Sequence, residues 1–197
     1  MKIVFPLMLL LLAAACNHRT GSDLAYLNKA EVLHNNMNAL TKVIVHDVFS
    51  PPVASRIYAY ASLAAYEAVR YSEKEAPSIT SHLHGFPAMP VPEKNKDYNF
   101  LLAATKAFFT VAEKITFSVD TLKKYQLPLY EDYRSALDEE TFERSIAFGE
   151  QVGKKVLERS AIDNYKKTRG LAKNLGSTEK GRWRPTPPDY LDGAEPY

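Results

Sequence analysis

The chain has 197 residues, with 25 Lys and Arg against 23 Asp and Glu and a formal net charge of +2. This near-neutral balance, without a dense run of basic residues, gives no reason to expect a nucleic-acid partner. The length suits a single domain with its own core, and the single cysteine excludes an internal disulfide. The fold must therefore be stabilised by packing alone.

The first fifteen residues have the layout of an export signal. Lys2 precedes an apolar run that ends in three alanines, and Cys16 follows them directly. The run is shorter than the about 20 apolar residues needed to span a bilayer. The arrangement resembles the lipobox of bacterial lipoproteins, in which the cysteine thiol carries a diacylglycerol. The alternative is an ordinary signal peptide with an incidental cysteine.

We therefore expect residues 1–15 to be a lipoprotein signal peptide and Cys16 to be the site of lipid attachment. The product would be exported and lipid-anchored to a bacterial membrane, in the periplasm or at the cell surface. Acyl chains contribute about 0.8 kcal/mol per buried methylene, so they hold a protein on a membrane without a spanning helix.

A short tether, 16–22, then leads into a helical domain that we place over 23–169. Apolar residues recur at helical spacing over 22–48, and a second helix is expected over 52–72 because two prolines suit its first turn. This second helix is rich in alanine and apolar around its whole circumference, which predicts a position at the centre of a bundle. A proline-rich surface linker follows, over 73–96.

Three more helices are expected over 97–116, 118–137 and 139–166, with Ser118 and Asp138 as N-caps. The predicted fold class is therefore all-α. It is a bundle of about five helices with a long extended C-terminal segment, and we expect the domain to be incomplete.

That C-terminal segment, 170–197, is rich in proline and glycine and has no helical period, although it holds the only tryptophan, Trp183. Its composition is typical of a disordered tail. We favour an extended segment that contacts something outside this sequence, because such long loops are uncommon in compact domains. It should then pack poorly, with Trp183 on an exposed apolar surface.

The histidines give no convincing metal site. Glu31 and His34 have the spacing of di-iron helical bundles, but those sites need a second such pair and two further glutamates. An exposed polar pair is favoured. His82 and His84 lie in the linker and would supply only two ligands, which is a weak site. No metal-binding residue is therefore assigned.

Two pairs of charged or titratable residues call for explanation. His46 beside Asp47 has the composition of a base with its orienting carboxylate, although an interaction of the imidazole with the helix C-terminus is favoured. Arg56 and Glu67 share one face of the apolar second helix but lie too far apart to pair with each other. Each needs a partner elsewhere. Structural ion pairs are favoured, and a place beside an anion site is the alternative for Arg56.

No nucleophile motif is present: the sequence contains no Gly-x-Ser-x-Gly, no phosphate-binding glycine loop and no His-Glu-x-x-His. Three segments in order carry a family resemblance instead. They are SPPVASRIYAY with AAYEA (50–60 and 64–68), ERSIAFG (143–149), and KTRG with GRWRPTPPDY (167–170 and 181–190). These resemble exported bacterial proteins of the vanadium-dependent haloperoxidase group, within the type-2 phosphatidic acid phosphatase superfamily, from about residue 33 to 197.

The resemblance implies a mostly helical fold whose site holds vanadate or phosphate. In that family one Lys and two Arg neutralise the oxyanion, a Ser-Gly-His segment supplies hydrogen bonds and acid–base function, and a second His bonds to vanadium or phosphorus. Those motifs lie in the family's C-terminal half. This sequence contains no Ser-Gly-His and no His after Arg184. No catalytic or cofactor-binding residue is therefore transferred to this chain.

Two hypotheses follow. In the first, the chain is the N-terminal half of a haloperoxidase- or acid-phosphatase-like lipoprotein, inactive alone, with no cofactor of its own and with a missing C-terminal half or a second subunit as its partner. In the second, it is a periplasmic helical binding or scaffold lipoprotein without catalysis. Both include the membrane as a partner through the lipid anchor, and neither includes nucleic acid. Peroxidase and phosphatase chemistry stay open.

Overall fold

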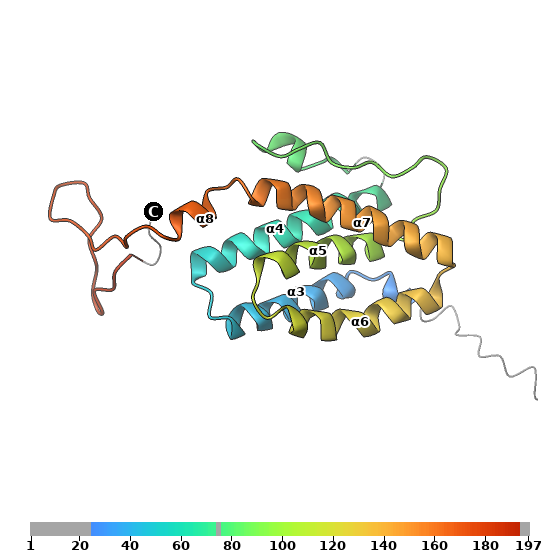
Figure 1. Ribbon diagram of the computed structural model, residues 1–197, viewed down its shortest axis with the longest axis horizontal. Coiled ribbons are helices and arrows are strands. Elements are labelled where there is room, and N and C mark those ends of the chain that lie inside the picture. The colour runs from blue at the N-terminus through green and yellow to red at the C-terminus, as the bar shows by residue number, and fades with distance from the viewer. Residues whose placement is uncertain (1–24, 74–75, 194–197) are drawn as a thin grey trace, which may run out of the picture.

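The computed structural model describes residues 25–73 and 76–193 (Figure 1). The expected signal peptide and Cys16 lie outside these residues. The described residues form helices and loops without a strand, which confirms the all-α fold class. The elements are α3 (Glu31–His46), α4 (Pro51–Val69), η1 (Arg70–Ser72), η2 (Thr80–His82), α5 (Phe100–Ile115), α6 (Val119–Ala136), α7 (Glu139–Ser160) and α8 (Tyr165–Thr168).

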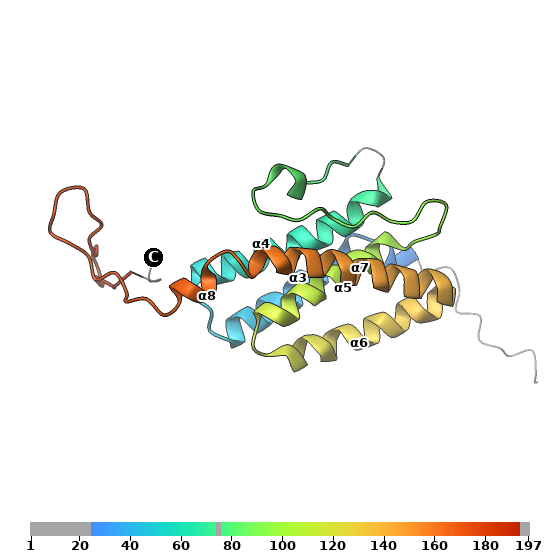
Figure 2. The same cartoon turned by 45° about the horizontal axis from the view of Figure 1, so that its top comes forward.

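Five long helices, α3 to α7, lie side by side as a bundle (Figures 1 and 2). The linker between α4 and α5 crosses one side of this bundle. The loops from α3 to α4 and from α5 to α6, the end of α7 and the short α8 all gather at the same end. The C-terminal segment, 170–193, leaves from that end and extends away from the bundle.

The centre of the bundle is α5, which corrects the expectation that the alanine-rich second helix would occupy it. Nine of the sixteen residues of α5 are buried, against seven of nineteen in α4. Helix α5 packs against α3, α4, α6 and α7. In α4, Ser55, Ala59 and Ser62 face solvent, although Ala64 and Ala65 are buried as expected. Alanine is compatible with both environments, so its abundance does not identify a central helix.

Two helix boundaries, the start of α3 and the end of α7, differ from the positions expected from the sequence. The first long helix begins at Glu31 rather than near residue 22. The buried Leu27 carbonyl oxygen accepts a hydrogen bond from the Tyr133 hydroxyl at 2.6 Å, which ties the preceding turn to α6. Helix α7 ends at Ser160 rather than near residue 166, since Asn164 has a left-handed backbone (φ 67°) that separates α8.

The two expected N-caps are found at the expected positions. The Asp138 carboxylate accepts from the Thr141 backbone N–H at 2.9 Å, the usual capping geometry at the start of α7. Ser118 is the N-cap residue of α6, but its hydroxyl donates to the Asp47 carboxylate instead of accepting from its own helix. The start of α6 is therefore tied to the end of α3.

Helices α5 and α7 approach each other closely at two glycines of α7. A Cβ atom added at Gly149 would lie 2.2 Å from the Ala103 carbonyl oxygen. One added at Gly153 would lie 2.7 Å from the Thr110 Cβ. The glycines are one helical turn apart, so they form a side-chain-free groove along α7 into which the α5 backbone fits.

The buried carboxylate of Glu67 attaches the linker to the bundle. Its side chain forms an ion pair with Arg70 at 3.2 Å and accepts hydrogen bonds from the Thr80 backbone N–H at 2.8 Å and the Ser78 hydroxyl. Only 1% of Glu67 is exposed. The expected structural ion pair of Glu67 is therefore present, with a partner one turn further along the chain.

Candidate functional site

Arg56, near the start of α4, is held by groups from the end of α7. Its Nε lies 2.6 Å from Oδ2 of Asp163, and its Nη2 donates to the Ser160 carbonyl oxygen at 3.0 Å. The guanidinium also lies 4.3 Å from the centre of the Tyr165 ring, a distance suited to a cation–π contact. The Tyr60 hydroxyl donates to the same carboxylate oxygen at 3.1 Å. This is the expected structural ion pair of Arg56.

Burial by itself would raise the pKa of Asp163. Hydrogen bonds from Arg56, from the Tyr165 backbone N–H and from the Tyr60 hydroxyl, together with the charge of Arg56, outweigh burial and hold that pKa below its ordinary value of 3.8. The carboxylate is therefore ionised in the folded protein at neutral pH, and its charge contributes to the attachment of α8 to the bundle.

We expect Asp163→Asn to lower the free energy of unfolding at pH 7 by about 1–3 kcal/mol, because the largely buried Arg56 loses its charged partner. The pKa of Asp163 is lower in the folded protein than in the unfolded chain. The stabilisation by its carboxylate is therefore complete above the pKa of the unfolded chain, about 4, and is lost as the pH falls from there through the pKa of the folded protein. Urea unfolding measured from pH 7 to pH 3 tests this. The wild-type chain should lose more stability than the variant over that range. If the free energies of unfolding of the two chains changed in parallel with pH, the prediction would be contradicted.

Asp47 has a structural role at the same end of the bundle. Its Oδ2 accepts from the backbone N–H groups of Phe117 and Ser118 at 2.8 and 3.1 Å. Burial alone would raise the pKa of Asp47, but these bonds, the Ser118 hydroxyl and the nearby His46 lower it. The side chain of Asp47 is thus committed to the start of α6, and the hypothesis of an Asp47-oriented His46 base gains no support from this geometry.

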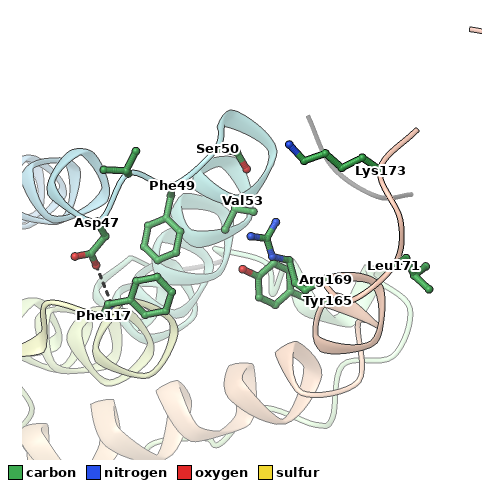
Figure 3. Close-up of a pocket in the computed structure, with 10 residues that line it drawn as sticks. Asp47, Phe49, Ser50, Val53, Phe117, Tyr165, Arg169, Leu171 and Lys173 are labelled. Carbon is green, nitrogen blue, oxygen red and sulfur yellow. Dashed lines mark hydrogen bonds between the residues drawn. The ribbon is translucent and has the colours of Figure 1, made fainter. Parts of the chain in front are cut away.

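A pocket of about 390 Å³ lies at this end of the bundle, and Asp47 is one of the residues that line it (Figure 3). Phe49 and Phe117 contact each other on one side with ring centres 4.8 Å apart and planes tilted by 34°, and Tyr165 lies opposite them. Basic side chains line the other side. The lining residues are Asp47, Val48, Phe49, Ser50, Val53, Phe117, Tyr165, Arg169, Leu171 and Lys173.

A second pocket of about 460 Å³ shares Phe49, Phe117 and Tyr165 with the first, and its basic lining residues are Arg56, Lys114 and Lys166. The two pockets therefore form one aromatic and basic surface at this end of the bundle. Neither is lined by a histidine or by a serine beside a base, so the surface offers shape, apolar area and positive charge rather than a nucleophile with its activating group.

The C-terminal segment is held by bonds within itself. The Ser177 backbone N–H donates to the Trp183 carbonyl oxygen at 3.1 Å, and the Gly193 N–H donates to the Asn174 carbonyl oxygen at 2.8 Å. Trp183 is 46% exposed. As expected, the segment packs poorly on the bundle. It is not simply extended, because its internal hydrogen bonds fold it into a loop (Figure 1).

The candidate metal residues do not converge. Glu31, His34, His82 and His84 are all exposed. Across residues 25–73 and 76–193, no group of three or more His, Cys, Asp or Glu side chains is placed to hold a metal ion. No helix among these residues is both long and apolar enough to cross a membrane.

Sequence reasoning missed the partners of Arg56 and the role of Asp47. Asp163 lies 107 residues from Arg56, and Phe117 lies 70 residues from Asp47. No local pattern connects residues so far apart. The one available signal was energetic: a cation in an apolar helix requires a carboxylate, but nothing in the sequence selects Asp163 from the other acidic residues.

This arrangement of helices is a haloperoxidase-like fold. A bacterial vanadium-dependent iodoperoxidase of known crystal structure matches it with a TM-score of 0.71 and 37% sequence identity, over 83% of this chain. The chain spans 39% of the length of that protein. No family model matches the sequence, and no curated protein matches it.

Proposed function

We propose that this chain is the N-terminal helical part of a haloperoxidase- or acid-phosphatase-like exported lipoprotein, without an oxyanion site of its own and inactive alone. The match to the iodoperoxidase is the observation that carries the proposal. It combines 37% identity over most of this chain with coverage of 39% of the other protein. The order of the resembling segments, which ends with the tryptophan-containing loop, supports the N-terminal position.

Two features of the described residues support the absence of a vanadate or phosphate site from this chain. A bound oxyanion needs clustered cations with their donors directed at it. Arg56 is directed at Asp163, and Arg70 is directed at Glu67. Neither the pocket of Figure 3 nor the second pocket is lined by a histidine that could bond to the central atom. The chemistry of the family would therefore depend on residues outside this chain.

The purified chain should show no vanadate-dependent oxidation of iodide by hydrogen peroxide and no phosphatase activity. The rate should not differ from that of buffer with vanadate, and a bacterial iodoperoxidase assayed in parallel serves as the positive control. Turnover above the buffer rate that disappears when vanadate is omitted would overturn the proposal. The DNA downstream of the Tyr197 codon gives a second readout, since a continuation with Ser-Gly-His supports the proposal.

The lipid anchor belongs to the same proposal. Cys16 follows the apolar segment and its three alanines, and its thiol would carry the diacylglycerol. Expressed in a bacterium, the wild-type chain should enter the detergent phase after phase separation, whereas Cys16→Ser should leave an unprocessed or soluble product. A serine variant with normal processing and normal detergent partition would show that Cys16 is incidental.

A further inference from the structure

Exposed apolar side chains gather at the end of the bundle from which the C-terminal segment leaves. Val48 is 86% exposed and Phe117 75%, and Ile162 and Leu171 are also exposed. We name these four residues the open end. Phe117 stands beside both pockets, so the exposed atoms continue into hollows rather than lying on a flat surface. Exposed apolar side chains that line pockets in this way are typical of interaction sites.

The C-terminal loop extends this surface. It presents Leu175, Trp183, Tyr190 and Leu191 to solvent, all among the exposed large apolar side chains. The Arg184 Nε donates to the Ser177 carbonyl oxygen at 3.1 Å, which helps to hold the loop in shape. A loop that keeps its shape while exposing its apolar side chains is prepared for a contact, because less conformational entropy is lost on binding.

The same region is strongly basic. Residues 164–184 contain one acidic residue, Glu179, against seven basic residues: Lys166, Lys167, Arg169, Lys173, Lys180, Arg182 and Arg184. The rest of the chain carries a net negative charge, since the overall net charge is only +2. A protein face that fits here therefore has an apolar centre and acidic residues around it. A second copy of the chain would bring this basic region against itself if it bound face to face.

We propose that the open end and the C-terminal loop together bind the polypeptide that corresponds to the part of the iodoperoxidase this chain does not match. This rests on the proposed function. That unmatched part is the larger share of the iodoperoxidase, since this chain spans 39% of its length. Another side of the bundle differs, because the linker attached through Glu67 covers it.

The test places a photo-cross-linking phenylalanine analogue at one position at a time in the full-length gene product in its own cells. The positions are Phe117 in the open end, Trp183 in the loop, and Leu127 as the control. Leu127 is 60% exposed but lies about 12 Å along α6 from the start of this helix at Val119. Mass spectrometry of the cross-linked peptides identifies the occupant, whether it is a separate subunit or a continuation of the chain.

We expect positions 117 and 183 to cross-link to peptides that align with the unmatched part of the iodoperoxidase, at least threefold more often than position 127. The double variant Lys167→Glu/Lys180→Glu should lower the yield from position 117 at least threefold. The matched variant Lys123→Glu/Lys124→Glu, which changes two exposed lysines of α6, should leave it unchanged.

Three outcomes would overturn the inference. Cross-links from 117 and 183 to lipid would make this a membrane-binding surface, and cross-links to a second copy would make it a dimer interface. Cross-links to the aligning polypeptide from position 127 alone would place the interface elsewhere while leaving the proposed function intact. Activity of the purified chain would instead refute the proposed function, so the two failures can be told apart.

Discussion

Replacing Gly149 by alanine should unfold the protein or lower its free energy of unfolding by about 3 kcal/mol or more. The new Cβ would lie 2.2 Å from the Ala103 carbonyl oxygen and 2.9 Å from its carbonyl carbon. Both contacts are to backbone, which cannot rotate away as a side chain can. The helices must separate instead, and overpacking of a tight core typically costs about 1–3 kcal/mol, occasionally more.

The expected loss of stability in Gly149→Ala is opposite to the effect that helix propensity alone would have. Alanine is favoured over glycine inside a helix by about 1 kcal/mol, so the same substitution at a solvent-facing position would stabilise α7. Gly153→Ala should be less damaging than Gly149→Ala, because its new Cβ would meet mainly the Thr110 side chain, at 2.7 Å. Gln151→Ala, on the exposed face of the same helix, is the matched control.

Thermal and urea unfolding of these variants distinguish steric packing from propensity. The expected order of stability is wild type and Gln151→Ala together, then Gly153→Ala, then Gly149→Ala. If Gly149→Ala were as stable as the wild-type chain, the close approach of α5 and α7 would be refuted.

The second large effect should follow the loss of the Glu67 carboxylate. We expect Glu67→Ala to lower the free energy of unfolding by about 3 kcal/mol, since breaking one partner of a buried ion pair typically costs about 3–5 kcal/mol. Arg70 is 18% exposed and keeps bonds to the Tyr71 hydroxyl and the Ala76 carbonyl oxygen, which places the effect at the lower end of that range.

This variant should also release the linker, because the Thr80 backbone N–H and the Ser78 hydroxyl lose their acceptor. Limited proteolysis should cut near residues 78–82 faster in Glu67→Ala than in the wild-type chain, even under conditions where both remain folded. Ser78→Ala is the graded control, since it removes hydrogen bonds but leaves the ion pair. Equal proteolysis of all three chains would show that Glu67 does not anchor the linker.

The fold class and most of the helices could be predicted from the sequence alone. Helical periodicity and capping residues are local properties, so the N-cap positions of Ser118 and Asp138 could be predicted from a few neighbouring residues. The need of Arg56 and Glu67 for partners also followed from the sequence, because a charge in an apolar helix is costly wherever it lies. The resemblance to haloperoxidases rested on ordered segments, and the structural match supports a haloperoxidase-like fold.

Three features could not be predicted without the packing of the whole chain: which helix is central, where α3 begins and α7 ends, and which residues form the open end. A periodic pattern shows that a helix has an apolar face but not how many neighbours cover it, and alanine fits both sides of α4. The ends of α3 and α7 depend on contacts with distant residues, such as Tyr133 with Leu27 and Arg56 with Asp163. Such long-range pairs arise from the packing of whole helices, which no local window of sequence contains.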